Sequence, residues 1–446
     1  MPIHTQTPIA ETEFFDPNCF AVPKGVDITD PSSSWIFWGF KGVGKTKLMH
    51  YLAVNSEHFV PIGNISVNPT FSAFKSCISD DAKSGRHVWP IFWKFTILCS
   101  YLQTITNISH IPEELRPITR ILTSHGFLPS TGISKAKRTF LRILKSVKSV
   151  GPIQIDFNEL LHTSRVFGVD IDAALVFAYN HLRALNIRIT FGIDGMDKAS
   201  SIDNDTTAEP SPIGVSIILG LIQALYEIHL SFRQLQPQGS FLLNIFSFLR
   251  ADLFHLAVSK VPEKTHVLGR LNPIEISWNR SELREIILRH LNYFPAYQDL
   301  VLDVEGNNET ESFISELALA DRRTTPRDAI EAARHLIQHP ETRIRFQNTT
   351  VIISAKRSSV QCSIQFVCEK RLDDTLSSIG VDIHNVLAGL RTRPGLANIK
   401  ALMLHSNPYA ITPTRETVGA RIRGLGIADV ADETLRICPL YCNAYG

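Results

Sequence analysis

A glycine-rich segment that ends in a lysine and a threonine is the part of the sequence best suited to chemistry. From Gly39 to Thr46 it reads GFKGVGKT, which matches the pattern G-x-x-x-x-G-K-[ST]. The apolar run Trp35–Trp38 before it predicts a buried strand, and a helical pattern starts at Lys45. A strand, a glycine-rich loop and a helix in this order form the setting in which the pattern binds phosphate. The alternative, a chance match within an ordinary turn, does not account for the flanking strand and helix.

The chemistry explains the spacing of these residues. A polyphosphate needs backbone N–H groups around it, and a glycine-rich turn at the start of a helix supplies them together with the favourable end of the helix dipole. Glycines let the backbone approach the phosphates without hindrance from a Cβ atom. We expect Lys45 to reach the β- and γ-phosphates and the Thr46 hydroxyl to bind Mg²⁺. The predicted phosphate-binding residues are Gly39, Phe40, Lys41, Gly42, Val43, Gly44, Lys45, Thr46 and Lys47.

An apolar segment that ends in aspartates is the second chemical landmark. Residues 187–197 read IRITFGIDGMD, a predicted strand with Asp194 at its C-terminal end and Asp197 three residues later. A strand that ends in aspartate is common and means little alone, but it gains weight beside the glycine-rich loop. We predict that Asp194 holds Mg²⁺ through water, opposite Thr46. Asp197 is predicted to orient or deprotonate an attacking water molecule.

Two arginines are placed to meet a phosphate group. Arg250 ends an apolar segment that we predict to be a buried strand, and in an open α/β sheet ligands lie outside the carboxyl ends of the strands. The alternative for Arg250 is a surface ion pair with Asp252 or Glu263. Arg327 lies at the start of a predicted helix, from which it can reach back to a bound nucleotide. Its alternative role is that of a helix-cap partner for Asp328.

Length and composition favour a globular cytoplasmic protein. The 446 residues suffice for two or three domains, and 44% hydrophobic residues allow a sizeable core. The net charge of +2 makes no whole-chain case for nucleic acid, and the 7 scattered cysteines fit a reducing compartment because they contain no C-x-x-C or zinc spacing. We find neither a signal-peptide pattern nor an apolar run of ~18 residues. We therefore expect a soluble, cytoplasmic protein without membrane contact.

Strands that alternate with helices predict an α/β fold, in which helices cover both faces of a parallel sheet. We predict an N-terminal arm at residues 1–30 and a P-loop NTPase core at residues 31–292. Few strand signals occur within 67–186, which we therefore predict to be a helical insertion. Residues 293–340 are predicted to form a helical lid. The remainder, 341–446, is predicted to be a winged-helix-like domain.

The C-terminal third carries an excess of basic residues. Between Leu319 and Gly424 there are 16 lysines and arginines against 9 aspartates and glutamates. Such a surface attracts phosphate groups, although a solvated basic surface without a ligand is an equal alternative. A winged helix in this region could dock in a DNA groove or contact a protein. Its predicted elements are short helices at Val386–Leu390 and Ile399–Leu404, a basic helix at Arg415–Leu425 and a strand at Leu435–Leu440.

The chain resembles a bacterial P-loop ATPase family related to the KAP and STAND NTPases, which is often encoded among mobile-element and anti-phage defence genes. The segments that carry the resemblance are WGFKGVGKT, FWKFTILCSYLQ, FGIDGMDK, FSFLRADLF, EISWNRSELREII, TTPRD and LRICPLY. The resemblance implies ATP hydrolysis as a regulatory or assembly switch and a C-terminal winged-helix-like unit. The residues that it places at or near the nucleotide are Lys45, Thr46, Asp194, Asp197, Arg250 and Arg327.

The leading hypothesis is therefore a Mg²⁺-dependent ATPase that acts as a molecular switch. ATP is favoured over GTP because the sequence contains no N-K-x-D segment. No glutamate directly follows Asp194, so we expect slow turnover or the use of Asp197. The alternative from another class is a nucleic-acid-binding protein of origin-recognition type, with ATP as a structural ligand. A third hypothesis is a self-associating scaffold whose C-terminal unit recruits an effector protein.

Overall fold

The structure is a computed structural model of the whole chain. It describes residues 20–23, 26, 36–62, 88–124, 128, 165–166, 169–196, 212–237, 241–261, 263–291, 293, 295–304, 307–308, 313–317, 324–377, 396–398, 428–431 and 434–437.

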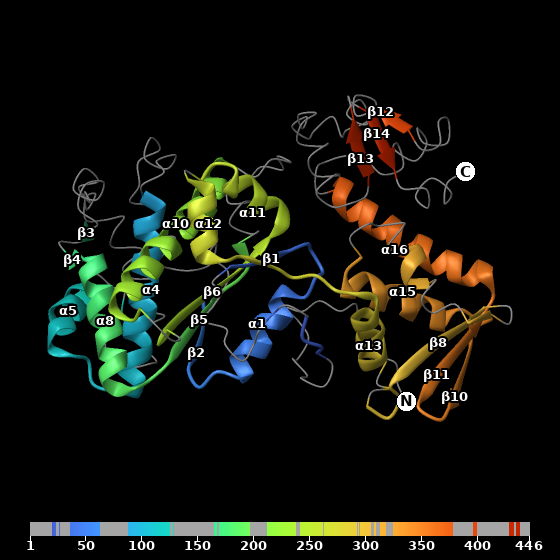
Figure 1. Cartoon of the computed structure of the whole chain (residues 1–446), viewed down its shortest axis with the longest axis horizontal. Helices are drawn as coiled ribbons and strands as arrows, with labels where there is room; N and C mark the ends of the chain where they lie inside the picture. The colour runs from blue at the N-terminus through green and yellow to red at the C-terminus, as the bar shows by residue number, and fades with distance from the viewer. Residues whose placement is uncertain are drawn as a thin grey trace.

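A five-stranded sheet forms the centre of the larger body in Figure 1, and each strand in it runs parallel to its neighbours. The α/β class and the parallel sheet that we predicted are therefore confirmed. Because the strands are parallel, the carboxyl ends of β1, β5 and β6 lie at one edge, where Gly39 pairs in register with Arg250. The strands, in spatial order, are β2 (Phe59–Ile62), β5 (Ile189–Ile193), β6 (Leu243–Arg250), β1 (Ile36–Gly39) and β7 (Ile274–Glu275).

Helices cover both faces of this sheet (Figure 1). Along β6, Ile245 joins a hydrophobic cluster with α4, α8 and α10, whereas Phe246 joins a second cluster with α1. Burial on both faces explains why β6 is apolar along nearly its whole length. The helices that the structure describes include α1 (Lys45–Val54), α4 (Val88–Ile108), α5 (Arg116–Ser124), α8 (Ile171–Leu185), α10 (Pro212–Leu235), α11 (Ala251–Val258), α12 (Lys264–Leu271), α13 (Arg280–His290), α15 (Pro326–Gln338) and α16 (Arg357–Ser377), with a 3₁₀ helix at Glu113–Leu115.

The helical insertion predicted at 67–186 is, in its described part, a portion of the main core. It is helical as expected, apart from the two-residue strands β3 (Arg165–Val166) and β4 (Val169–Asp170). The side chain of Trp93 is fully buried, and its Nε1 donates a hydrogen bond to the carbonyl oxygen of Ile217 in α10 (2.9 Å). Since α4 is apolar around most of its circumference, it has to be enclosed by the sheet and by other helices. Residues 67–87, 125–127, 129–164 and 167–168 of the predicted insertion lie outside the described residues.

A second sheet corrects the predicted boundary between residues 340 and 341. Strand β8, within the expected helical lid, pairs in parallel with β11, within the expected winged-helix domain, over six residue pairs. Alternation of buried and half-buried side chains in Asp299–Val304 (DLVLDV) is the strand signal that our prediction missed. The four strands, in spatial order, are β10 (Arg343–Gln347), β11 (Thr350–Ala355), β8 (Asp299–Val304) and β9 (Asn307–Asn308).

The C-terminal region contains a small antiparallel sheet of order β12-β14-β13. Its strands are β12 (Leu396–Asn398), β13 (Ala428–Ala431) and β14 (Thr434–Ile437), and β14 overlaps the predicted strand Leu435–Leu440. The helices predicted between residues 386 and 425 lie outside the described residues, as do residues 1–19 of the predicted arm. The winged-helix assignment therefore stays a prediction.

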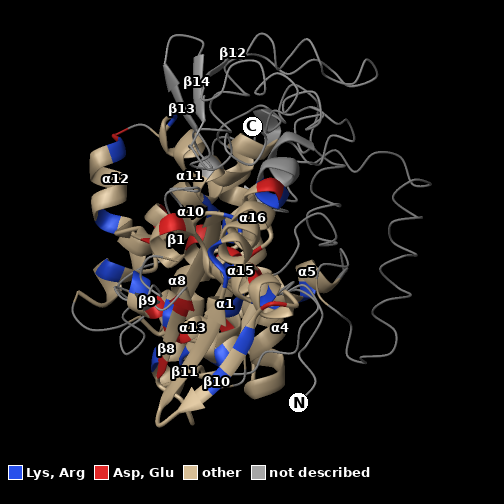
Figure 2. Cartoon of the chain, turned by 90° about the vertical axis from the view of Figure 1, so that its right-hand side faces the viewer, with Lys and Arg blue, Asp and Glu red and all other residues tan. Residues whose placement is uncertain are grey.

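Acidic partners neutralise much of the described part of the basic C-terminal third. Figure 2 shows lysine and arginine interspersed with aspartate and glutamate over α13, α15, α16 and the second sheet. The ion pairs join Arg345 to Asp303, Lys356 to Glu341, Arg357 to Glu316, Lys370 to Glu331 and Arg371 to Asp328.

Helix α10 is long and apolar enough, over Gly214–Leu235, to cross a membrane by length and hydropathy alone. Polar residues such as Gln223 and Glu227 interrupt the run, which is why the sequence pattern did not mark it. In the structure 67% of the most hydropathic window is buried inside the protein, and α10 packs on α4 and in the main core. This burial is typical of a core helix.

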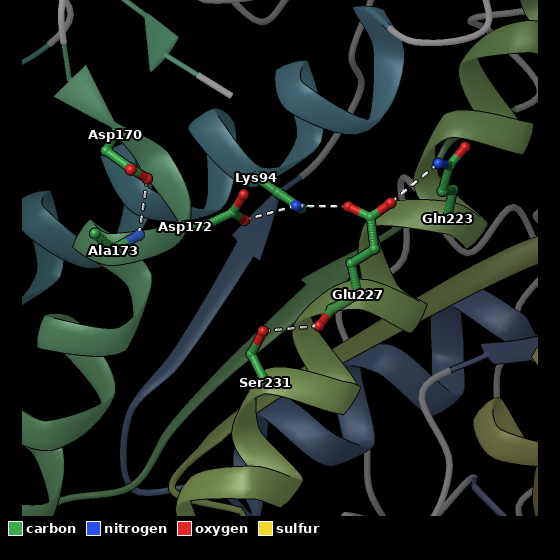
Figure 3. Close-up of polar contacts among 7 residues, drawn as sticks. All are labelled: Lys94, Asp170, Asp172, Ala173, Gln223, Glu227 and Ser231. Carbon is green, nitrogen blue, oxygen red and sulfur yellow. Dashed lines mark hydrogen bonds and ion pairs between the residues drawn. The ribbon is translucent and has the colours of Figure 1, made fainter. Parts of the chain in front are cut away.

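A buried lysine ties three of the covering helices together (Figure 3). The side chain of Lys94, in α4, is 5% exposed, and its Nζ lies 2.6 Å from Asp172 of α8 and 2.5 Å from Glu227 of α10. Burial by itself lowers the pKa of Lys94, but Glu227 and Asp172 outweigh that effect and leave the pKa above its ordinary value. Lys94 is therefore a charged link between the helices.

We predict that the two carboxylates of this cluster act non-additively on stability. Either Asp172→Asn or Glu227→Gln leaves Lys94 one charged partner, so each should lower the free energy of unfolding by about 1 kcal/mol. The double variant leaves a buried ammonium without a charged partner and should cost about 3–5 kcal/mol. Urea unfolding of the parent, the two single variants and the double variant measures the coupling energy between the two carboxylates. Strictly additive losses would contradict the prediction.

Candidate functional site

The glycine-rich loop connects β1 to α1, as predicted. Gly42 and Gly44 adopt φ angles of 87° and 95°, which side chains with a Cβ atom rarely adopt. Helix α1 begins at Lys45, directly after Gly44. The Nζ atom of Lys45 donates hydrogen bonds to the carbonyl oxygens of Gly39 (3.1 Å) and Phe40 (2.9 Å). The ammonium group therefore lies within the turn of the loop.

Thr46 and Asp194 meet although they are separated by 148 residues. The Thr46 hydroxyl donates a hydrogen bond to Oδ2 of Asp194 at 2.7 Å. Asp194 follows β5 and Thr46 lies in the first turn of α1, so the shared edge of the parallel sheet brings the two together. Strand β6 lies between β1 and β5, so the contact spans the end of an intervening strand.

The Thr46–Asp194 pair fits Mg²⁺ better than a metal that needs a protein cage. A hydroxyl and a carboxylate are hard oxygen ligands, and Mg²⁺ usually takes only one or two protein ligands and keeps waters and phosphate oxygens. Among the described residues, no group of three or more His, Cys, Asp or Glu side chains is placed to hold a metal ion. Asp197, the predicted water-orienting residue, lies outside the described residues.

A cavity of about 200 Å³ opens over the loop. Five cationic side chains line it, against the single carboxylate of Asp194, so its electrostatic potential favours a multiply charged anion. The size and the charge suit a polyphosphate. The lining residues are Lys41, Gly42, Gly44, Lys45, Thr46, Lys47, Asp194, Gly195, Phe248, Arg250, His290, Pro326, Arg327 and Ile330.

Both predicted arginines line this cavity. Arg250 ends β6 and enters from the sheet edge, while Arg327 enters from the first turn of α15. The alternative partner for Arg327 was Asp328. The carboxylate of Asp328 instead accepts hydrogen bonds from Thr325 in a capping box and contacts Arg371 of α16. The side chain of Arg327 is thus on the cavity side of the helix start.

The start of α15 lies directly against the loop. A Cβ atom added at Gly42 would stand 2.9 Å from Oγ1 of Thr325 and 3.2 Å from Cβ of Arg327. The close approach requires a glycine for its size as well as for its backbone angle. A displacement of α15 would therefore change its contact with the loop, and a displacement of the loop would change its contact with α15.

Sequence analysis missed two residues that contact the loop or the cavity. Trp278 had no predicted role beyond its place in the segment EISWNRSELREII, but its Nε1 donates a hydrogen bond to the carbonyl oxygen of Val43 (2.8 Å). His290, the last residue of α13, carried no sequence signal at all. Burial first, and then the charges of Arg334 and Lys47, lower the pKa of His290 to about 4. At neutral pH the imidazole is uncharged.

A smaller cavity of about 60 Å³ adjoins the first. The two share the lining residues Gly44, Lys47, His290 and Pro326, so they lie next to each other. The rest of the smaller cavity is apolar or aromatic, which suits a flat organic ring rather than an ion. These further lining residues are Phe20, Ala21, Trp278 and Ile286.

Comparisons with protein-family models, curated proteins and solved structures give no match to this chain.

We predict that Gly42→Ala destabilises the protein. The left-handed backbone angle alone costs about 1–2 kcal/mol for a residue with a Cβ atom, and the overlap with Thr325 adds to it. Gly269→Ala is the matched control, because nothing lies within 4 Å of its added Cβ and alanine favours the interior of α12 by about 0.5–1 kcal/mol. In denaturant unfolding, the free energy of unfolding should fall for Gly42→Ala and rise for Gly269→Ala. Equal stabilities would contradict the close packing of α15 on the loop.

Proposed function

We propose that the protein is a P-loop NTPase that binds ATP with Mg²⁺ and hydrolyses it. The observation that carries the proposal is the 2.7 Å contact between Thr46 and Asp194 beside a glycine-rich loop. A hydroxyl at the start of the helix and a carboxylate at the end of a nearby strand are the pair that holds the metal in such sites. Asp194 would act through a water ligand, as we expect from the sequence.

The charge of the cavity supports polyphosphate binding. Lys45 and the loop amides would surround the β- and γ-phosphates, and Arg250 and Arg327 would neutralise charge that develops on the γ-phosphate. In-line attack by water needs little covalent chemistry from the protein, so positioning supplies most of the catalysis. Asp197 is proposed to orient the attacking water.

The smaller cavity supports a nucleoside as the remaining part of the ligand. Its aromatic and apolar lining lies beside Gly44, where the phosphate-binding loop meets α1. We propose that the base of ATP lies there, against Trp278 and Phe20. Adenine remains the favoured base because the sequence lacks the N-K-x-D segment that GTP-binding sites use.

The attachment of α15 supports a proposed role as a switch. Its start contacts Gly42, and two ion pairs join it to α16: Asp328 to Arg371, and Glu331 to Lys370 at 2.9 Å. A change at the γ-phosphate that moves Arg327 would therefore move α16 as well. We propose that the C-terminal winged-helix-like unit receives this movement and passes it to a protein or DNA partner in the cytoplasm. We propose a role in anti-phage defence from the resemblance to the P-loop ATPase family that is related to the KAP and STAND NTPases.

Replacing Lys45 tests the hydrolysis proposal. Lys45→Ala removes the ammonium that contacts the phosphates, so the rate of phosphate release from ATP should fall by about 100-fold or more. Lys264→Ala, on the exposed surface of α12, is the control and should keep the parent rate. Hydrolysis by Lys45→Ala at the parent rate would refute the assignment.

Replacing Thr46 tests the metal assignment separately. Thr46→Val preserves the shape of the side chain but removes the oxygen that would bind Mg²⁺. The Mg²⁺ concentration for half-maximal hydrolysis should rise about tenfold or more, which corresponds to a loss of about 1.4 kcal/mol. Thr119→Val, in α5, is the control. An unchanged Mg²⁺ requirement would exclude Thr46 as a ligand.

A further inference from the structure

His290 lies where the two cavities meet. It is one of the four residues that line both, together with Gly44, Lys47 and Pro326. Of these four it is the only one with a ring that can both donate and accept hydrogen bonds. A ligand that occupies both cavities would therefore lie beside this side chain.

The surroundings of His290 are strongly cationic. Lys47 of α1 and Arg334 of α15 are the charges that act most on its pKa. The N-terminal residues Phe20 and Ala21, on the remaining side of the smaller cavity, carry no charged side chain. The other charged groups nearby line the larger cavity: Lys41 and Lys45 of the loop and α1, Arg250 at the end of β6, Arg327 of α15 and Asp194 after β5.

Burial and these positive charges keep the imidazole uncharged in the protein alone, since its pKa is lowered to about 4. A polyphosphate reverses the electrostatic part of this balance, because it brings several negative charges among the cations. The end of α13 also favours a cation, because the helix dipole is negative there. The helix dipole acts with and without the ligand, so the rise in the pKa of His290 on binding comes from the anion.

We propose that His290 contacts the bound nucleotide directly and takes up one proton from solvent as the polyphosphate enters. The proton adds to the unprotonated ring nitrogen, and both N–H groups then act as donors in the site. No other bond forms or breaks. This inference rests on the proposed function, and it names a further nucleotide-binding residue and a coupling between binding and pH.

The sign of the coupling follows from linkage. A group whose pKa rises on binding strengthens binding as the pH falls. Between a pKa of about 4 in the free protein and the higher value in the complex, the dissociation constant should increase up to about tenfold per pH unit as the pH rises. Above the pKa of the complex, His290 contributes no further pH dependence.

Isothermal titration calorimetry with a non-hydrolysable ATP analogue and Mg²⁺ measures the proton uptake. At pH 6, titrations in two buffers of different ionisation enthalpy give the number of protons bound per nucleotide. The nucleotide titrates as well, so the informative quantity is the difference between parent and His290→Gln, which should approach one proton. His335→Gln is the matched control, because burial also lowers the pKa of His335 but it lines neither cavity. It should match the parent.

Each outcome is decisive. Equal proton uptake by the parent and His290→Gln, with nucleotide bound to both, overturns the role of His290 and leaves the nucleotide site standing. Failure of the parent to bind the analogue overturns both proposals. If His290→Gln does not fold, NMR titration of the histidine rings in the parent replaces it. A His290 pKa that stays near the free value with nucleotide bound contradicts the inference.

Discussion

The chemistry of this molecule depends on one constraint, the parallel alignment of three neighbouring strands. Because β5, β6 and β1 all end at the same edge, a carboxylate, a guanidinium and a glycine-rich loop from distant parts of the sequence arrive at one place. An antiparallel arrangement of the same strands would send Arg250 to the opposite edge. The hydrogen bond between Thr46 and Asp194 forms because of that alignment.

The site also depends on helices that are not part of the sheet. The start of α15 touches Gly42, and both the indole of Trp278 and the ring of His290 come from the segment around α13. Two parts of the chain thus form the site: the sheet with its loop, and the helices that follow β7. Helix α16 in turn holds α15 through the ion pair between Asp328 and Arg371 and through packing, and β8 of the second sheet packs against α13.

The sequence predicted the elements with strong local signals. The glycine pattern located the loop, apolar runs located β1, β5 and β6, and the pattern around Pro326 located the start of α15. The pairing of β8 with β11 was not predictable, because the paired residues are 51 apart in the sequence and no hairpin turn joins the two strands. Trp278 and His290 were missed for a similar reason, since their roles arise only when α13 packs beside the loop.

The hydrogen bond from Trp278 to the loop has an optical consequence. Trp89 and Trp93 are fully buried in the main core and Trp38 stacks on Phe254, whereas the indole of Trp278 forms a wall of the smaller cavity. Its emission is therefore sensitive to a ligand that contacts this wall, whereas Trp38, Trp89 and Trp93 line neither cavity. Trp278 is thus an intrinsic fluorophore that both contacts the glycine-rich loop and lines the smaller cavity.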